Sequence, residues 1–177
     1  FIGTGVLVES EQGNIRMTPK GARLSMSSKV EEGNEEYVLY KDVFDKNTDI
    51  RYTAINEGVK EDIILNAYNG NNTFEYIVEA EGLTPVRNAG KTVEFYDGNL
   101  QTVYTLGEIV LFDSADMPAT NSNNSYTVEE IDDGKYLVTL VIDEEFLTDE
   151  NTVYPVVIDP EVEAIKDNKW SKQFKAT

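Results

Sequence analysis

Acidic residues supply the first candidate chemistry in this sequence, because the chain holds 33 Asp and Glu residues against 15 Lys and Arg residues. Two carboxyl groups placed on either side of a scissile bond are the machinery of most glycosidases. Adjacent carboxylates include Glu61 with Asp62 and Asp143 with Glu144. With so many acids such pairs are expected by chance, and nothing in the sequence selects one of them. A glycoside hydrolase or lyase fragment is therefore a minor hypothesis.

A second candidate site is an oxygen-rich turn that could bind calcium. Asp45, Asn47 and Asp49 have the spacing that opens an EF-hand loop, and their side-chain oxygens suit a hard cation. Ile50 stands where that loop needs glycine, and Asn56 stands where it needs its final glutamate. The segment is therefore not an EF-hand. Two interpretations stay open, a looser calcium site and an Asp/Asn-rich turn between two strands.

Aromatic residues could bind sugars, because carbohydrate modules stack sugar rings on exposed aromatic side chains. The chain has ten tyrosines, seven phenylalanines and one tryptophan. The candidates lie near turns or in the C-terminal segment: Tyr68, Tyr96, Tyr126 and Trp170. The competing interpretation is core or rim packing, in which a tyrosine buries its ring and keeps its hydroxyl at the surface.

Two residue types are missing, and their absence limits the chemistry of the chain. Without histidine there is no usual general base, no Ser-His-Asp triad and no imidazole metal ligand. Without cysteine there is no disulfide, no thiolate nucleophile and no cysteine-type zinc site. We therefore expect no enzymatic activity and no cofactor, although the acidic charge is compatible with cations, calcium included.

The net charge of −18 bears on the partners of the chain. An acidic protein repels phosphate backbones, so we expect no nucleic-acid partner. No apolar run approaches the roughly 18–20 residues that span a bilayer, so we expect no membrane insertion either. The alternative interpretation is that surface acid keeps an exported protein soluble and monomeric.

Short apolar segments separated by turn residues predict an all-β fold. Their spacing of roughly 8–12 residues is typical of a sandwich or a barrel. The predicted strands, in chain order, are Val6–Val8, Ala22–Met26, Glu36–Leu39, Ile50–Ile55, Val59–Leu65, Phe74–Ala80, Val93–Tyr96, Thr102–Tyr104, Ile109–Phe112, Tyr126–Ile131, Tyr136–Ile142 and Val153–Ile158. We expect an antiparallel β-sandwich of about ten or more strands, with at most one short helical turn, at Asp143–Thr148.

Side-chain alternation places the charges of one predicted strand. Lys60 and Glu61 are neighbours, so their side chains point to opposite faces of the sheet and each pairs elsewhere. The turn-rich stretch Thr84–Gly90 is expected to be a loop, and Asp159 followed by Pro160 is expected to end the last strand.

The domain organisation follows from the same pattern. Residues 1–160 are expected to form the sandwich, and residues 161–177, which are polar and lack alternation, a linker or the start of another module. The sequence opens at Phe1 without a signal-peptide pattern, so we expect it to be cut from a longer protein.

Two parts of the chain resemble a known class of proteins. Tyr40–Phe44, Thr48–Tyr52 and Gly58–Leu65 together resemble a stretch of large Gram-positive exported proteins. The heptapeptide YPVVIDP at Tyr154–Pro160 resembles the segment that closes such regions. This class comprises the RHS/YD-repeat, wall-associated (WapA-like) proteins and related surface proteins that carry DNRLRE domains. The chain itself contains neither a DNRLRE domain nor a YD repeat.

The resemblance implies a non-catalytic structural or adhesion module of a large secreted or cell-wall-associated bacterial protein. Its expected partners are neighbouring modules of the same polypeptide and cell-wall or plant polysaccharide, and its expected location is secreted or at the cell surface. The alternative from another class is a carbohydrate-binding module of an extracellular polysaccharide-degrading system. The exposure of the four candidate aromatic residues would discriminate the two.

Overall fold

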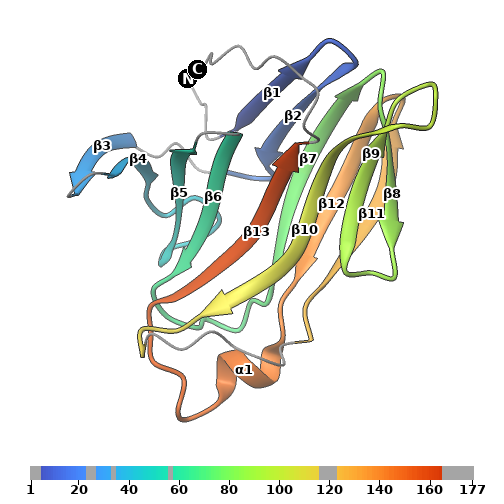
Figure 1. Cartoon of the computed structure of the whole chain (residues 1–177). Helices are drawn as coiled ribbons and strands as arrows, with labels where there is room; N and C mark the ends of the chain where they lie inside the picture. The colour runs from blue at the N-terminus through green and yellow to red at the C-terminus, as the bar shows by residue number, and fades with distance from the viewer. Residues whose placement is uncertain (1–4, 23–26, 33–34, 56–57, 116–122, 165–177) are drawn as a thin grey trace.

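The computed structural model describes residues 5–22, 27–32, 35–55, 58–115 and 123–164. In these ranges the chain forms thirteen β-strands and one short helix, arranged as two antiparallel sheets (Figure 1). The elements are β1 (Val6–Ser10), β2 (Gly13–Pro19), β3 (Ser27–Glu32), β4 (Glu35–Tyr40), β5 (Thr48–Ile55), β6 (Gly58–Leu65), β7 (Thr73–Glu81), β8 (Thr84–Asn88), β9 (Thr92–Tyr96), β10 (Thr102–Phe112), β11 (Ser125–Asp132), β12 (Lys135–Val141), α1 (Glu144–Thr148) and β13 (Val156–Ala164).

The two sheets differ in size. The smaller has five strands in the order β1-β2-β7-β12-β11, and the larger has eight in the order β3-β4-β5-β6-β13-β10-β9-β8. The predicted antiparallel β-sandwich is therefore confirmed. At one end of the larger sheet, strands β3, β4 and β5 extend beyond the main body of the molecule (Figure 1).

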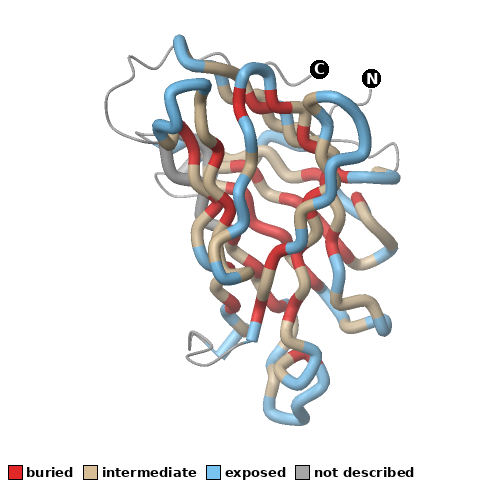
Figure 2. The backbone as a smooth tube through the Cα atoms, turned by 90° about the vertical axis from the view of Figure 1, so that its right-hand side faces the viewer, coloured by how far each residue is buried: buried red, intermediate tan, exposed pale blue. Residues whose placement is uncertain are grey.

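Alternation along the strands builds the main core between the sheets. In β7, Phe74, Tyr76, Val78 and Ala80 are buried, while the residues between them are half-buried on the outer face. β9 follows the same two-residue period, and so does the end of β10, residues 109–112. Buried positions lie in the interior of the molecule and exposed ones gather in its turns (Figure 2). This period is the pattern of sheets that bury one face each.

A second, smaller core lies under β4 and β5. Its buried members are Tyr40, Val43, Ile50 and Tyr52, and the Tyr40 and Tyr52 rings meet edge to face with their centroids 6.0 Å apart. Phe44 packs against both cores. The β3–β5 part of the large sheet thus has its own apolar packing, joined to the main core through this aromatic residue.

Two hydrogen bonds and a buried tyrosine tie the sheets together at β8 and β11. The Tyr126 amide donates to the Gly90 carbonyl over 2.8 Å, and the Arg87 guanidinium donates to the Tyr126 carbonyl over 3.1 Å. The Tyr126 hydroxyl crosses the core and donates to the Gly107 carbonyl over 2.9 Å. β11 is an edge strand, so these contacts close one side of the sandwich.

Most of the expected strands are present, but some of the observed strands were not expected. No strand was predicted at Gly13–Pro19 or at Ser27–Glu32, which form β2 and β3, and Thr84–Gly90 was expected to be a loop but contains β8. The two strands expected at 102–104 and 109–112 are one long strand, β10, with a register shift between Leu106 and Ile109. The strand expected at 22–26 falls mostly outside the described residues.

The last strand runs past the proline that was expected to end it. β13 continues to Ala164, and Pro160 is buried opposite Ile109 of β10. β13 pairs with β6 only through Val156–Ile158 in the described residues, so the missing amide hydrogen of Pro160 breaks no bond on that side. The boundary expected between residues 160 and 161 therefore falls within a strand.

The single helix described, α1, has five residues. Asp143 caps it, because its side chain accepts a hydrogen bond from the Glu145 amide over 3.1 Å. Over the ranges given above, no helix is long and apolar enough to cross a membrane.

Candidate functional site

β6 carries charged residues on both of its faces, and this strand organises the two polar sites of the molecule. Ile63 and Leu65 point into the core, so Glu61, two residues before Ile63, points inward as well. Lys60 and Asp62 point outward, and Lys60 pairs there with Asp159 of β13. The prediction that Lys60 and Glu61 face opposite sides of the sheet is confirmed.

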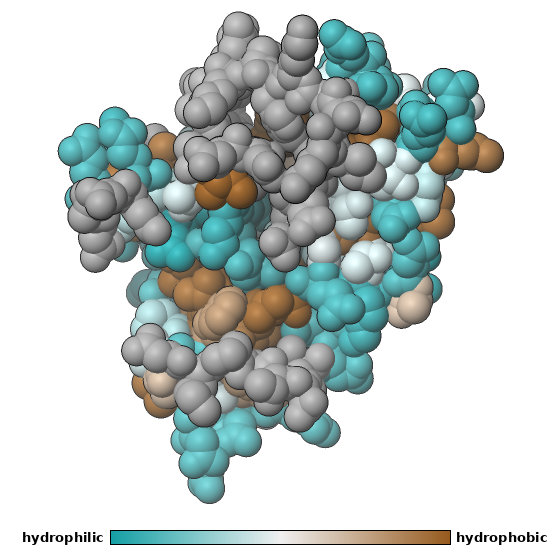
Figure 3. All heavy atoms as spheres, viewed as in Figure 1, coloured by the Kyte–Doolittle hydropathy of each residue, from teal (hydrophilic) through white to brown (hydrophobic). Residues whose placement is uncertain are grey.

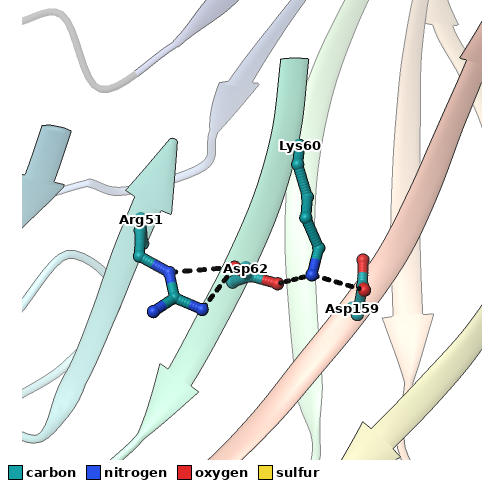
Figure 4. A network of polar contacts seen from close by, with 4 residues as sticks. All are labelled: Arg51, Lys60, Asp62 and Asp159. Carbon is teal, nitrogen blue, oxygen red and sulfur yellow. Dashed lines mark hydrogen bonds and ion pairs between the residues drawn. The ribbon is translucent and has the colours of Figure 1, made fainter. Parts of the chain in front are cut away.

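The outward site is a network of four charged residues from three neighbouring strands (Figure 4). Arg51 of β5 donates to Asp62 Oδ2 from Nε over 2.9 Å and from Nη2 over 2.7 Å. Lys60 Nζ lies 3.3 Å from Asp62 Oδ1 and 3.0 Å from Asp159 Oδ2. The two cations and two anions alternate across the sheet, so the charges of the network balance.

This network is partly withdrawn from water, which changes its acid–base behaviour. The Asp62 side chain is 1% exposed although it lies on the outer face, whereas Lys60 keeps 41% of its side-chain surface exposed. Burial raises the pKa of Asp159, against the opposing effect of Lys60. Burial lowers the pKa of Lys60, but its hydrogen bond to Asp159 and the charge of Asp62 outweigh it and the net shift is upward.

The network borders an apolar surface on the same face. Ile64, Val157 and Phe112 lie side by side on β6, β13 and β10, since Val157 pairs with both of the others. Phe112 keeps 36% of its surface exposed, and the other two are half-buried. In Figure 3 apolar surface gathers at the middle of this face, beside hydrophilic surface.

The inward site is Glu61, which lies between the two sheets. It is 4% exposed, and its Oε1 atom has no hydrogen-bond partner. Burial raises the pKa of Glu61 to about 7, with Tyr76 and Tyr52 acting in the opposite direction through their hydroxyls. The Tyr76 hydroxyl is also buried and makes no hydrogen bond of normal geometry. A carboxyl group with such a pKa can bind and release a proton near neutrality.

The predicted calcium turn connects β4 and β5, where its side chains bond to the protein itself. Asp49 Oδ1 accepts from the Asp42 amide over 2.9 Å, and Oδ2 accepts from Asn66 Nδ2 over 3.1 Å. Asp45 Oδ1 accepts from the Thr48 hydroxyl over 2.7 Å, and Asn47 has a positive φ of 124°. In the part of the chain that the structure describes, no three Asp, Glu, His or Cys side chains are grouped to hold a metal ion. Calcium binding at Asp45, Asn47 and Asp49 stays a prediction, which melting with and without calcium would test.

The candidate aromatic residues are not brought together. Tyr126 is fully buried, with its hydroxyl bonded to Gly107. Tyr68 lies beside α1 and donates to Glu144 over 2.8 Å, whereas Tyr96 donates to Glu94 at the end of β9. The β9–β10 turn and α1 lie at opposite ends of the molecule (Figure 1). Trp170 lies outside the described residues.

The two carboxylate pairs chosen from the sequence do not act as pairs. Glu61 and Asp62 are on opposite faces of β6, separated by the sheet. Asp143 caps α1 and also accepts from the Asn123 amide over 2.8 Å, while Glu144 accepts from Tyr68. Neither pair faces a common space in which a glycosidic bond could be held.

Sequence reasoning missed the partners that make both sites. Arg51 was not singled out, Asp159 was named only as the expected end of a strand, and Tyr76 was not recognised as a neighbour of Glu61. Alternation along the two predicted strands could have placed Arg51 beside Asp62, because these strands are consecutive and the two residues are paired. The approach of Asp159 to Lys60 depends on pairing between β6 and β13, which lie far apart in the sequence.

Comparison with known proteins finds relatives for most of the chain. No protein-family model matches it, and no solved structure matches it at a significant level. The tRNA3(Ser)-specific nuclease WapA of Bacillus spizizenii is 32% identical over 160 residues, which cover 87% of this chain and 6% of that protein. The chain is similar to a segment of the WapA nucleases.

Two further relatives agree. The tRNA nuclease WapA of Bacillus subtilis strain 168 is 32% identical over 149 residues, which cover 81% of this chain and 6% of that protein. The tRNA(Glu)-specific nuclease WapA of Bacillus subtilis subsp. natto is 31% identical over 160 residues, with 87% and 6% covered. The chain therefore spans only a small part of the curated relatives that it matches. The expected WapA-like resemblance is confirmed, whereas nothing in these matches bears on RHS repeats or DNRLRE domains.

The names of these relatives correct three expectations. A structural or adhesion module, with its alternatives of a carbohydrate-binding module and a glycoside hydrolase or lyase fragment, was the wrong function, because the relatives are named as tRNA nucleases. The expectations of no enzymatic activity and of no nucleic-acid partner were wrong for the same reason. These expectations were wrong because they were drawn from the residue types and net charge of a segment that matches only 6% of each relative. Charge and histidine content in one segment do not constrain chemistry and binding elsewhere in a long protein.

Proposed function

We propose that this chain is a β-sandwich segment of a longer protein that cleaves tRNA. The observation that carries the proposal is the 31–32% identity to three proteins named as tRNA nucleases, over 149–160 residues. The similarity covers 81–87% of the chain, so it includes most of the sandwich.

The finer organisation of the longer protein is part of the proposal. We infer that it is secreted or exposed at the bacterial cell surface and that it carries RHS-type or DNRLRE-type regions beyond this chain. Support comes from the resemblance of Thr48–Tyr52, Gly58–Leu65 and Tyr154–Pro160 to segments of such exported proteins. In the structure the first lies in β5, the second forms β6 and the third leads into β13. β6 pairs with both β5 and β13. Two segments far apart in the sequence thus meet at the centre of one sheet.

The experiment uses the complete protein that contains this chain. Purified protein is incubated with total tRNA from a bacterium, and the RNA is separated on a denaturing gel and sequenced at new ends. We expect discrete cleavage products from tRNA, and none from the same RNA treated with heat-unfolded protein. Intact tRNA after incubation with folded, full-length protein would overturn the proposal.

A parallel experiment determines which part of the complete protein cleaves the tRNA. The 177-residue chain alone is given the same tRNA at the same concentration. Cleavage by the chain itself would assign the chemistry to this segment, and cleavage only by the complete protein would assign it to another part. Both results support a tRNA nuclease.

A further inference from the structure

A carboxyl group buried between the sheets has no charged partner on its own side among the described residues. Glu61 enters the space between β6 and β7, where its neighbours are the hydroxyls of Tyr52 on β5 and Tyr76 on β7. Oε1 of Glu61 and the hydroxyl of Tyr76 are both buried and have no hydrogen-bond partner. An ionised carboxylate in such a place costs several kcal/mol unless a cation accompanies it.

No cation accompanies Glu61 among the groups that act on it in the described residues. Tyr52, Tyr76 and the more distant Tyr126 face it from β5, β7 and β11, and none of them is positively charged. Asp62 adds a negative charge through the strand, which disfavours ionisation further. The basic residues of β5 and β6, Arg51 and Lys60, pair with Asp62 and Asp159 on the outer face. Among the described residues, a proton is therefore the one means of neutralising Glu61.

The position of Glu61 matters because the two cores meet there. Tyr52 belongs to the small core under β4 and β5, and Tyr76 belongs to the main core. Phe44 bridges them, and its ring lies edge to face with Tyr76 at a centroid distance of 5.6 Å. A charge at Glu61 therefore acts on the contact that holds the β4–β5 part of the large sheet against β7.

We propose that Glu61 is a proton-binding site at the junction of the two cores, and that its protonation holds β4 and β5 against β7. The protonated carboxyl group carries an O–H that can donate to the neighbouring tyrosine oxygens, whereas the ionised form can only accept. Loss of the proton leaves a buried charge, which is relieved when β4 and β5 move away and admit water. The sandwich is then tightest in mild acid and looser above neutrality.

The direction of the pH dependence follows from linkage. The pKa of Glu61 is raised from 4.5 to about 7 in the folded state. Its stabilising effect is therefore complete below pH 4.5 and is lost as the pH rises through about 7. The chain has no histidine and no cysteine that would titrate in this range. Asp159, whose pKa is also raised, lies on the outer face with Lys60.

The test compares the wild-type chain with Glu61→Gln, which keeps the shape of the side chain but cannot ionise. Equilibrium denaturation is measured from pH 5 to pH 8 at constant ionic strength. For the wild type we expect the folding equilibrium constant to fall on the order of 100-fold between pH 5 and pH 7 and to level off above that. Glu61→Gln should be nearly flat, while Glu129→Gln, an exposed glutamate of β11, should keep the wild-type slope.

Two further measurements locate the effect and guard against a variant that fails to fold. Hydrogen exchange should accelerate with pH in β4 and β5 beyond the intrinsic rate increase, while β12 stays protected. Tyr52→Phe removes a hydroxyl that favours the ionised form, so the pH transition should move upward. A wild-type slope in Glu61→Gln, uniform acceleration in all strands, or an unmoved transition in Tyr52→Phe would each overturn the proposal. None of these readouts depends on tRNA cleavage.

Discussion

At the scale of single residues, Asp62 is the central member of the charged network on the outer face. Its carboxylate receives Arg51 on one oxygen and Lys60 on the other, and it is 1% exposed. A buried carboxylate with two cations is costly to remove, because Arg51 then loses its carboxylate partner and Lys60 keeps only Asp159. Arg51 and Lys60 pair with Asp62 on the face of the sheet opposite to Glu61.

Replacing Asp62 by Ala should lower the free energy of unfolding by about 1–3 kcal/mol. The figure lies below that for a fully buried pair because Arg51 and Lys60 are 30% and 41% exposed and water screens them. Urea denaturation at pH 7 measures the loss. The matched control is Glu75→Ala, which removes the exposed ion pair to Lys20 of 2.9 Å and should cost less than about 1 kcal/mol. Equal losses in the two variants would contradict the special role of Asp62.

At the scale of elements, the β1–β2 hairpin depends on its glycine. Gly13 has a φ of 154°, and a Cβ atom placed on it would lie 2.6 Å from the Glu81 carbonyl oxygen and 2.7 Å from Leu83 Cγ. The start of β2 therefore approaches the end of β7 more closely than any side chain permits. This close approach brings β1 and β2 onto the small sheet.

Gly13→Ala should destabilise the chain by about 2–3 kcal/mol, because backbone strain and a clash with main-chain atoms act together. Gly70→Ala is the comparison, since Gly70 has a φ of 91° but nothing within 4 Å of the added carbon. Thermal melting of both variants separates strain from clash. Equal decreases in the melting midpoint for the two substitutions would contradict the importance of the close approach at Gly13.

The elements also show what a sequence can and cannot specify. The strands that form the β5–β6 and β11–β12 hairpins were predicted because short apolar segments separated by turn residues are local features of the sequence. β8 was missed because Pro85 is typical of a loop, yet β8 is an edge strand, where proline is tolerated. β10 was divided at Gly107, where the sheet has a register shift instead of a break.

The candidate sites were predictable only in part for a related reason. Alternation correctly placed Lys60 and Glu61 on opposite faces of one strand. It could not show that Asp159 would lie beside Lys60, or that Tyr76 would lie beside Glu61, because these contacts depend on how strands and sheets distant in sequence are matched. The charge and histidine content of a segment likewise could not indicate the nuclease names of its longer relatives.

At the scale of the whole molecule, Tyr126 links the two sheets through the core. Its hydroxyl reaches the Gly107 carbonyl of β10 over 2.9 Å, at the register shift where the ladder is interrupted. A buried carbonyl without its partner keeps the cost of having left water. The tyrosine thus compensates for the irregularity of the longest strand.

Tyr126→Phe should lower the free energy of unfolding by about 1–2 kcal/mol, because the Gly107 carbonyl loses its hydrogen bond while the ring still fills the core. Chemical denaturation gives the value. Tyr104→Phe is the control, since the Tyr104 hydroxyl makes a weaker contact of 3.4 Å to the Gly13 carbonyl. A larger loss for Tyr104→Phe than for Tyr126→Phe would contradict this account.

The outermost strand of the large sheet, β3, has one side that no described strand covers. Such a side is a template on which a second copy could add its own strand and begin a polymer. Lys29 and Glu31 are exposed along β3, and Lys29 lies 3.2 Å from Glu36 of β4. An incoming copy would have to bury these charges, so the same residues that contribute little to folding oppose the addition of a strand at this edge.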